Sequence, residues 1–340
     1  MKSLSDFPRA VLAHTPTPLE PLANLSGALA RAELWVKRDD CTGLGMGGNK
    51  ARQLEYYVGD AQARGADTLV ITGAVQSNFV RATAAAAAKL GMQCEIQLED
   101  RVDDVDETYR RSGNVLLDRL FGARLHTYAD GEDEVGADAA LEAIAQRVRQ
   151  RGREPYVIHL AEGHRPLGAL GYVSAAHEVL QQLEQHAIDV AAIVVASGSG
   201  ATHAGLLVGL AAAGRSDIAV HGICVRRDAE AQAGRVLRVA QATCAELDSG
   251  DLVTASQVHV HDDWLAPGYG KPGDETLAAI RTAARHEGLL LDPVYSGKSF
   301  AGMLGLVGRG TFAAGARVMF VHTGGTPALF GYRTVLEAAL

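Results

Sequence analysis

The stretch that decides the fold is Gly47-Gly48-Asn49-Lys50-Ala51-Arg52-Gln53-Leu54-Glu55. Two glycines free the backbone for an unusual turn, and asparagine is a residue type that favours the position just before a helix. The apolar residues that follow recur at helical spacing, namely Leu54, Tyr57, Val58 and Ala61. These features predict a helix whose first turn carries Lys50.

Lys50 is expected to be a reactive amine. The chain has only six lysines against twenty-six arginines, so a lysine directly after a glycine turn stands out. A lysine at a helix start feels the positive end of the helix dipole, which lowers the pKa of its ammonium group and favours the free amine. The alternative, from this stretch alone, is an ordinary solvated lysine in the first turn.

Composition limits the kind of protein. The 340 residues are enough for one large or two medium domains, and the net charge of −8 without a basic run argues against nucleic acid or an anionic membrane as a partner. The four cysteines show neither metal-ligand spacing nor a CxxC pair, which predicts a reduced protein with no disulfide and no metal site. Without a signal-peptide core or a bilayer-spanning apolar run, we expect a soluble, cytoplasmic protein.

Strand-like and helix-like stretches alternate along nearly the whole chain, which predicts an α/β fold with a largely parallel sheet. The clearest buried strands are expected at 68–72, 93–98, 123–127, 156–160, 191–196 and 220–225. Helices are expected between them, and the acidic stretch 129–138 is interpreted as a solvated turn. A smaller α/β unit is predicted to be inserted into a larger one, with Lys50 at the junction.

A glycine-rich loop follows the strand expected at 191–196. It reads Ser197-Gly198-Ser199-Gly200-Ala201-Thr202, and a helix of small residues begins at once. Free backbone N–H groups and a helix N-terminus together hold a phosphate group. The loop matches neither the Walker pattern nor the dinucleotide-binding fingerprint, so a small cofactor with one phosphate suits it better than a nucleotide. The alternative is a tight strand–helix turn without a ligand.

Two further loops with small, polar residues leave the ends of strands. They read Gln76-Ser77-Asn78 and His322-Thr323-Gly324-Gly325-Thr326. In an open parallel sheet, ligands bind outside the carboxyl ends of the strands. A reactive lysine, a phosphate-binding loop and these polar loops together indicate a Schiff-base cofactor with one phosphate, which is pyridoxal 5'-phosphate.

Six co-linear motifs carry a family resemblance. They are Gly47-Gly48-Asn49-Lys50, Gln76-Ser77-Asn78, the loop from Ser197 to Gly205, Pro267-Gly268-Tyr269-Gly270, the segment from Asp292 to Lys298, and the segment from His322 to Pro327. With these motifs the chain resembles the D-cysteine desulfhydrase / 1-aminocyclopropane-1-carboxylate deaminase family, which also includes L-cysteate sulfo-lyase. The resemblance runs from Phe7 to about Phe330.

The resemblance implies an architecture. The family belongs to the tryptophan-synthase-β-like enzymes of fold type II, so two open, largely parallel sheets flanked by helices are expected. It implies a larger domain for pyridoxal phosphate from residues 1–50 and 165–340, and a smaller inserted α/β domain from residues 51–164. The active site would lie between the two domains, and the protein is expected to form a homodimer.

The resemblance also assigns roles to residues. Lys50 would be the Schiff-base lysine and the base at Cα of the substrate. Asn78 would bind the phenolic oxygen of the cofactor, and Ser77 would face the substrate carboxylate or its Cα. The phosphate would lie in the loop of Gly198, Ser199, Gly200, Ala201 and Thr202. The reacting side chain would lie against Tyr269 and Tyr295, and the cofactor pocket would be closed by Thr323 and Gly324.

Position 296 separates the branches of the family. In the deaminase motif a glutamate there faces the pyridine nitrogen, whereas this chain has Ser296. A carboxylate keeps that nitrogen protonated, while a hydroxyl leaves it neutral and weakens the electron sink. Opening a strained ring is the more demanding reaction, so Ser296 favours β-elimination of a sulfur leaving group.

Two departures from the family pattern leave the substrate open. Members with desulfhydrase or sulfo-lyase activity have histidine where this chain has Phe79, and a Gly-Gly-Ser-type loop where it has 161–166. In that loop, His164 and Arg165 precede a helix expected from Gly168. The arginine would bind a second anionic group of the substrate, a carboxylate or sulfonate, through paired hydrogen bonds. The alternative is an exposed arginine that only pairs with Glu162.

The sequence therefore predicts a lyase dependent on pyridoxal phosphate that breaks a carbon–sulfur bond by β-elimination. A small amino acid of the D-cysteine or L-cysteate type would give pyruvate, ammonia, and sulfide or sulfite. The first alternative is a 1-aminocyclopropane-1-carboxylate deaminase, or a related deaminase or dehydratase for another three-carbon amino acid. The second alternative is a non-catalytic protein that stores or senses the cofactor.

Overall fold

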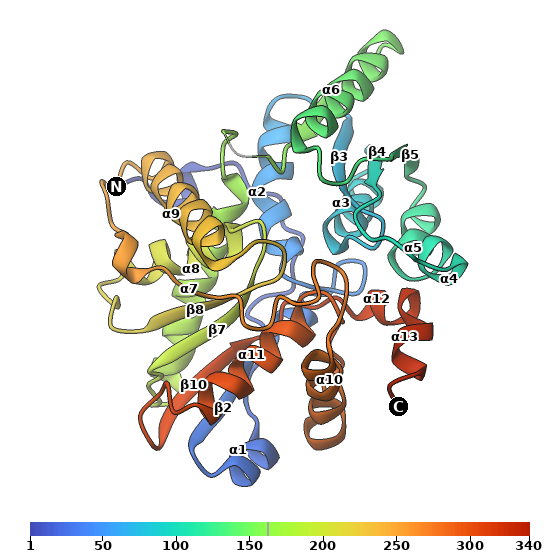
Figure 1. Cartoon of the computed structure of the whole chain (residues 1–340). Helices are drawn as coiled ribbons and strands as arrows, with labels where there is room; N and C mark the ends of the chain where they lie inside the picture. Colours follow the sequence, from blue (N-terminus) through green and yellow to red (C-terminus); the bar gives the residue numbers. More distant parts are fainter. Residues whose placement is uncertain (162) are drawn as a thin grey trace.

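The computed structural model describes residues 1–161 and 163–340 and contains two sheets flanked by helices (Figure 1). The order in the larger sheet is β1 (Leu19–Pro21), β2 (Ala32–Lys37), β10 (Ala316–Val321), β7 (Ala192–Ser197), β8 (Ala219–Cys224) and β9 (His259–His261). The order in the smaller sheet is β5 (Arg124–Tyr128), β4 (Gln93–Glu99), β3 (Thr68–Ala74) and β6 (Pro155–Ile158). Among the strand pairs of the described residues, β1–β2 alone is antiparallel, so the predicted fold is confirmed.

Helices cover both faces of each sheet. The larger sheet packs on one face against α7 (Leu167–Gln185), α8 (Ala201–Ala212) and α9 (Ala229–Glu246), and on the other against α1 (Ala23–Leu29), α10 (Asp274–Glu287) and α11 (Ser296–Gly308). The smaller sheet packs against α6 (Glu134–Gln150) on one face and against α2 (Lys50–Ala63) and α3 (Asn78–Lys89) on the other. In the described part of the chain, no helix has the length and apolarity needed to cross a membrane.

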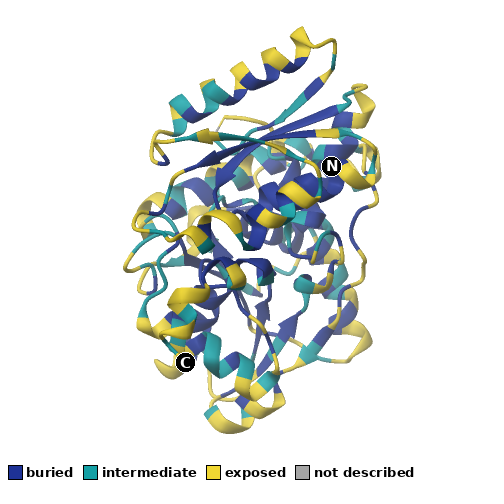
Figure 2. Cartoon of the chain, turned by 90° about the vertical axis from the view of Figure 1, so that its right-hand side faces the viewer, coloured by how far each residue is buried: buried dark blue, intermediate teal, exposed yellow. Residues whose placement is uncertain are grey.

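The remaining helices are short. They are η1 (Leu4–Asp6), η2 (Asp39–Cys41), α4 (Glu107–Arg111), α5 (Gly113–Leu120), η3 (Ala255–Gln257), α12 (Thr326–Gly331) and α13 (Arg333–Glu337). Figure 2 shows the central strands buried in the interior, while the helices are exposed on their outward sides; the edge strands β5 and β9 are partly exposed. This burial on both faces explains why the strands read as apolar runs rather than as alternating patterns.

The helix α2 lies between the two halves of the molecule. It begins at Lys50 as predicted, after Gly47 and Gly48, whose φ values of 70° and 115° are accessible to glycine but strained for other residues. Along α2, Leu54 packs into the core of the smaller sheet, whereas Tyr56 packs into the core of the larger sheet. A helix buried on two sides holds its first residue rigidly relative to both sheets.

One local prediction is wrong. The acidic stretch 129–138 is not only a solvated turn, because α6 begins within it at Glu134. Asp133 caps this helix by accepting a hydrogen bond from the N–H of Gly136 at 2.8 Å. Acidic residues before and in the first turn complement the positive end of a helix dipole, so the same residues suit a helix start as well as a turn.

The predicted division into domains stays a prediction, and the packing adds a detail to it. The strands of the smaller sheet lie within 51–164, and those of the larger sheet lie outside that range. The core of the smaller sheet also contains Leu12 and Leu44 from before this range and Ala328 and Tyr332 from the C-terminal part of the chain. Chain segments from both ends therefore complete the core of the smaller unit.

A buried ionic network holds α2 against the larger sheet. The guanidinium group of Arg52 donates two hydrogen bonds to Asp39, at 2.9 and 3.0 Å, and two to Glu178 on α7, at 2.8 and 2.9 Å. Lys37, at the end of β2, binds Glu178 at 2.5 Å, and Tyr172 donates to Asp39 at 2.6 Å. Two cations therefore balance two anions in a region where Asp39 and Arg52 are only 1% and 2% exposed.

The pKa of Asp39 shows how closely the charges are matched. Burial by itself raises the pKa of a carboxyl group, but the charge of Arg52 and its hydrogen bonds hold the pKa of Asp39 below its ordinary value. Asp39 is therefore a carboxylate throughout the neutral range. Its stabilising contribution is present above the pKa of an unfolded aspartate and is lost as the pH falls through the lower folded value.

Removing Arg52 should destabilise the protein strongly. In Arg52→Leu, the buried Asp39 would lose its main cation, and Glu178 would keep only Lys37. We expect a loss of roughly 3–5 kcal/mol in the free energy of unfolding. The matched control is Arg64→Leu at the other end of α2, where the arginine of the ion pair with Asp60 is 58% exposed and the pair is worth about 1 kcal/mol at most. Urea unfolding of the two variants measures the difference, and equal losses would contradict this role for the network.

Candidate active site

A cavity opens where loops from both sheets meet. It is reached by the carboxyl ends of β3, β7, β8 and β10 and by the first turns of α2, α3 and α8. Of the residues singled out in the sequence, those that line it are Lys50, Ser77, Asn78, Phe79, Gly198, Ser199, Gly200, Thr202, Tyr269, Tyr295 and Thr323. Parallel strands bring their carboxyl ends to one edge, which is why loops far apart in the sequence converge here.

The amine of Lys50 points into this cavity in a poorly solvated position. Its Nζ atom lies 3.1 Å from Oε1 of Gln53 and 4.6 Å from the centre of the Phe79 ring. Desolvation by burial lowers the pKa of Lys50 to about 8. The lowered pKa agrees with the expectation of a reactive amine, and burial is its cause here.

The glycine-rich loop has the form of an anion-binding turn. Gly200 precedes α8 with a φ of 92°, a conformation that favours glycine. The hydroxyl of Thr202 accepts hydrogen bonds from Asn49 Nδ2 and Gln53 Nε2, both at 2.9 Å. With both acceptor positions occupied, its O–H remains as a donor for a phosphate oxygen. Asn49 therefore joins the lysine helix to the loop instead of capping α2 with its side chain.

The start of α3 supplies a second set of polar groups. Ser77 caps this helix by accepting hydrogen bonds from the N–H groups of Phe79 and Val80 at 3.2 and 3.4 Å. The Oδ1 atom of Asn78 accepts from Asn114 Nδ2 at 3.0 Å, which leaves its amide N–H groups as donors. Both residues line the cavity next to a positive helix end, as a phenolate or carboxylate ligand requires.

Two tyrosines face the same space. The hydroxyl groups of Tyr269 and Tyr295 lie 2.6 Å apart. Burial raises the pKa of Tyr295 well above its ordinary value, so this residue stays a neutral phenol that can donate a proton. Lys298 binds the carbonyl oxygens of Leu265 and Gly268 at 2.5 and 2.7 Å and thereby holds the loop that carries Tyr269.

Some predicted residues lie behind the cavity wall. Ala201 begins α8 but does not line the cavity. Gly324, with a φ of 88°, packs so closely on Gly48 that a Cβ atom there would lie 2.6 Å from its Cα. The hydroxyl of Ser296 accepts a hydrogen bond from the N–H of Asp292 at 2.7 Å and donates to the carbonyl of Gly324 at 3.2 Å. The cofactor roles given to these residues stay predictions.

His164 and Arg165 are not brought to the cavity of Lys50. Arg165 donates two hydrogen bonds to Glu246 at the end of α9, each at 2.7 Å, and its side chain is half exposed. It lines neighbouring hollows together with His164, while the main cavity is lined by Leu160 from the same segment. The alternative partner of Arg165, Glu162, lies outside the described residues. The local sequence could not predict this position of Arg165, because its partner Glu246 comes from a distant helix.

The cavity is also lined by a group of charged residues that the sequence motifs do not predict. They are Arg101, Arg226, Arg227 and Arg235, with Glu99 and Glu134 as acidic neighbours. Arg226 and Arg227 both pair with Glu134, and Arg101 pairs with Glu99. A signal was available, because Arg226 and Arg227 directly follow a predicted strand at the edge where ligands bind.

Comparisons with known proteins agree with this geometry. The sequence pattern of the family described as "Pyridoxal-phosphate dependent enzyme" matches residues 11–324. The D-cysteine desulfhydrases of Salmonella typhi and of Salmonella newport (strain SL254) are each 44% identical to this chain over 329 residues, 97% of either chain. A crystal structure described as an ACC deaminase homologue has a TM-score of 0.88 and 37% identity, covering 99% of this chain and 98% of its own.

The chain belongs to the pyridoxal-phosphate dependent enzymes. It resembles the D-cysteine desulfhydrases and the ACC deaminase homologue within that family. The cavity fits the cofactor, because one amine of lowered pKa, one glycine turn with a free hydroxyl donor and one helix start with amide donors face the same space. Pyridoxal phosphate, when bound, withdraws electrons from Cα of an amino acid.

Replacing Lys50 should remove covalent attachment of the cofactor. We expect Lys50→Ala to lose the visible absorbance of the yellow enzyme, and pyridoxal phosphate to pass a desalting column separately from the protein. The matched control is Lys298→Met, because the pKa of Lys298 is also lowered to about 8 but its Nζ is bound to backbone carbonyls. Lys298→Met should keep the visible absorbance. If Lys298→Met lost the absorbance and Lys50→Ala kept it, Lys298 would be the lysine that binds the cofactor.

Proposed function

We propose that this enzyme removes sulfur from Cβ of a three-carbon amino acid, and that D-cysteine is the first substrate to test. The proposal is carried by Lys50 and the pair Tyr269–Tyr295, which line one cavity. β-Elimination needs a base for the proton on Cα and an acid near the leaving group on Cβ. The amine of Lys50, whose pKa burial lowers to about 8, can act as the base, and the neutral phenol of Tyr295 can act as the acid.

The residues act in a definite order in this proposal. Ser77 and Asn78, at the start of α3, bind the substrate carboxylate, and the ring of Phe79 limits the size of the side chain. The amine of Lys50 takes the proton from Cα, the bond from Cβ to sulfur breaks, and the hydrogen-bonded tyrosines give a proton to the departing sulfur. Addition of water to the remaining fragment gives pyruvate and ammonia, so cysteine and water are converted into pyruvate, ammonia and hydrogen sulfide.

The charged group at the cavity supports a second candidate, a substrate with a sulfonate such as L-cysteate. Arg101 and Arg226 lie with their side chains only 9% and 13% exposed, and the charge of Arg101 acts on both Tyr269 and Tyr295. A guanidinium group beside the leaving group stabilises a departing anion, whether hydrosulfide or sulfite. We therefore propose that these arginines, rather than Arg165, bind a second anionic group of the substrate.

Position 296 stays the proposed reason for elimination rather than ring opening. The serine there, whose hydroxyl donates to the carbonyl of Gly324, supplies no carboxylate that would keep the pyridine nitrogen protonated. We also propose, on the family resemblance, that the enzyme is a cytoplasmic homodimer. The two proposals are tested separately. The reaction products test the role of position 296, and sedimentation of the holoenzyme tests the dimer.

A substrate panel should identify the reaction. We expect the holoenzyme to release pyruvate and sulfide from D-cysteine faster than from L-cysteine, and little or no four-carbon 2-oxo acid from 1-aminocyclopropane-1-carboxylate. Sulfide, sulfite and each 2-oxo acid are measured separately. Pyruvate and sulfite from L-cysteate as the main products would favour the second candidate, and a dominant four-carbon product would overturn the elimination proposal.

The tyrosine pair should act on turnover rather than on cofactor binding. We expect Tyr295→Phe to lower kcat roughly 10²–10⁴-fold, the usual contribution of a general acid, with an unchanged cofactor spectrum. The control is Tyr156→Phe, which removes a hydroxyl bound to Asp60 outside the main cavity. Similar kcat values for Tyr295→Phe and wild type would exclude this tyrosine as the acid.

A further inference from the structure

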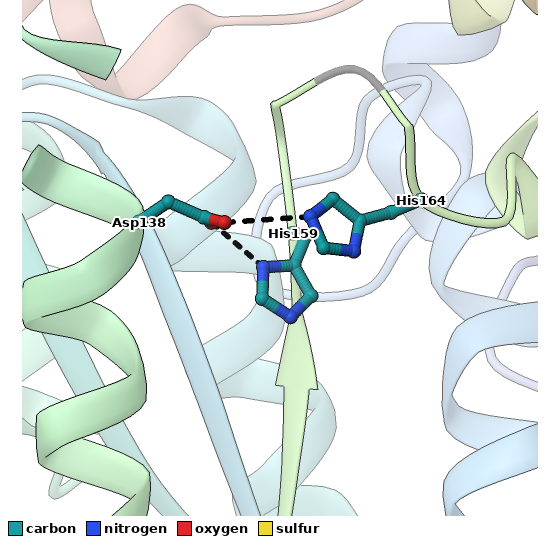
Figure 3. Close-up of side chains that lie close together, drawn as sticks. All are labelled: Asp138, His159 and His164. Atoms are coloured by element: carbon teal, nitrogen blue, oxygen red, sulfur yellow. Dashed lines mark hydrogen bonds and ion pairs between the residues drawn. The ribbon is translucent and has the colours of Figure 1, made fainter. Parts of the chain in front are cut away.

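A group of two histidines and two carboxylates lies beside the main cavity, and the proposed reaction does not use it. Asp138 and Glu142 come from successive turns of α6, His159 directly follows β6, and His164 precedes α7. Figure 3 shows both imidazole rings turned with one nitrogen toward the carboxylate of Asp138. Three segments distant in sequence thus bring their polar atoms to one point.

The distances are those of a preformed ligand set. Nδ1 of His159 lies 2.7 Å from Oδ1 of Asp138, and Nε2 of His164 lies 3.3 Å from Oδ2. The three ligand atoms lie within 4.8 Å of one another. Donors around a tetrahedral Zn²⁺, with bonds of about 2.0–2.2 Å, lie roughly 3.3–3.6 Å apart. Small side-chain rotations would therefore place all three atoms around one ion.

The outer contact of His159 supports the same conclusion. Its Nε2 atom lies 3.1 Å from Oε1 of Glu142 while Nδ1 faces Asp138. A histidine that binds a metal through one ring nitrogen usually donates its other N–H to a carboxylate, which fixes its tautomer and orientation. The two rings stack with centroids 3.7 Å apart and planes at 2°, so the second histidine is also held in place.

We propose that Asp138, His159 and His164 form a binding site for a divalent first-row transition metal such as Zn²⁺, with Glu142 as the outer carboxylate. Two imidazoles and one carboxylate favour Zn²⁺ or Co²⁺ over Mg²⁺ or Ca²⁺, which prefer oxygen ligands. This site departs from the expectation of no metal site, which rested on the spacing of the four cysteines. Its two histidines are separated by four residues, a spacing that zinc sites also use.

The position of the site suggests what the metal does. Asp138 also lines the main cavity, as do Leu160 and Ala161, which follow His159. A bound ion would link α6 and the residue after β6, which border one side of the cavity, to His164 outside it. The ion thus stabilises that wall. The inference is independent of the substrate, because none of these residues takes part in the proposed steps.

Metal binding can be measured on the holoenzyme after chelator treatment and without substrate. Competition between the protein and a chromogenic chelator should show one equivalent of Zn²⁺ per chain, and Co²⁺ should give the visible bands of a tetrahedral site. His164→Ala should weaken binding at least about tenfold, and Glu142→Gln should weaken it about tenfold, as loss of an outer partner does. Both side chains are substantially exposed, so these variants should fold.

Two controls separate this site from other metal-binding groups. His186→Ala changes an exposed histidine beyond the other end of α7 and should leave Zn²⁺ affinity unchanged. All proteins carry Cys41→Ser, because Cys41 has the exposed thiol among the cysteines. Equal Zn²⁺ affinity in His164→Ala and its parent, or no stoichiometric binding in the parent, would overturn the proposal. Loss of affinity in His164→Ala and Glu142→Gln but not in His186→Ala would support it.

Discussion

The bidentate contacts of Arg52 to Asp39 and Glu178 are the constraint on which the site depends. One guanidinium group fixes α2 to the end of β2 and to α7 at the same time. A buried ion pair of this kind adds little net stability compared with an apolar core, because desolvation offsets much of the attraction. Its value is geometric, since an ordered fork of hydrogen bonds permits few alternative positions of the helix.

That geometry also fixes the position of Lys50. The lysine lies two residues before Arg52, so a rigid arginine leaves the lysine backbone little freedom. From the other side, the backbone N–H of Asn49 donates to the carbonyl of Thr323 at 3.0 Å, and its side chain donates to Thr202. The start of α2 is therefore tied to the larger sheet through the loops after β7 and β10. The amine is presented at a fixed distance from the glycine turn, as a cofactor anchored at both ends requires.

The sequence was sufficient for what depends on local pattern. Buried parallel strands read as short apolar runs, and each loop motif follows its strand directly, so the fold and the converging loops could be predicted. Contacts between segments distant in the sequence could not be predicted in this way. The helix after Arg165 predicts a position near the substrate, but Glu246, 81 residues further on, binds this arginine away from the cavity. The acidic sequence around Glu134 predicts a turn, but Glu134 begins α6 and pairs with arginines that follow β8.

The pKa values give a more general lesson about finding a reactive lysine. Burial lowers the pKa of both Lys50 and Lys298 to about 8, so this property alone does not distinguish them. Their contacts do. The amine of Lys298 donates to two backbone carbonyls, and using it as a nucleophile would release the loop that carries Tyr269. The amine of Lys50 faces a side-chain oxygen and an aromatic ring at an open cavity, so it can react without disturbing the backbone. A lowered pKa becomes evidence for catalysis only where the free amine has room to act.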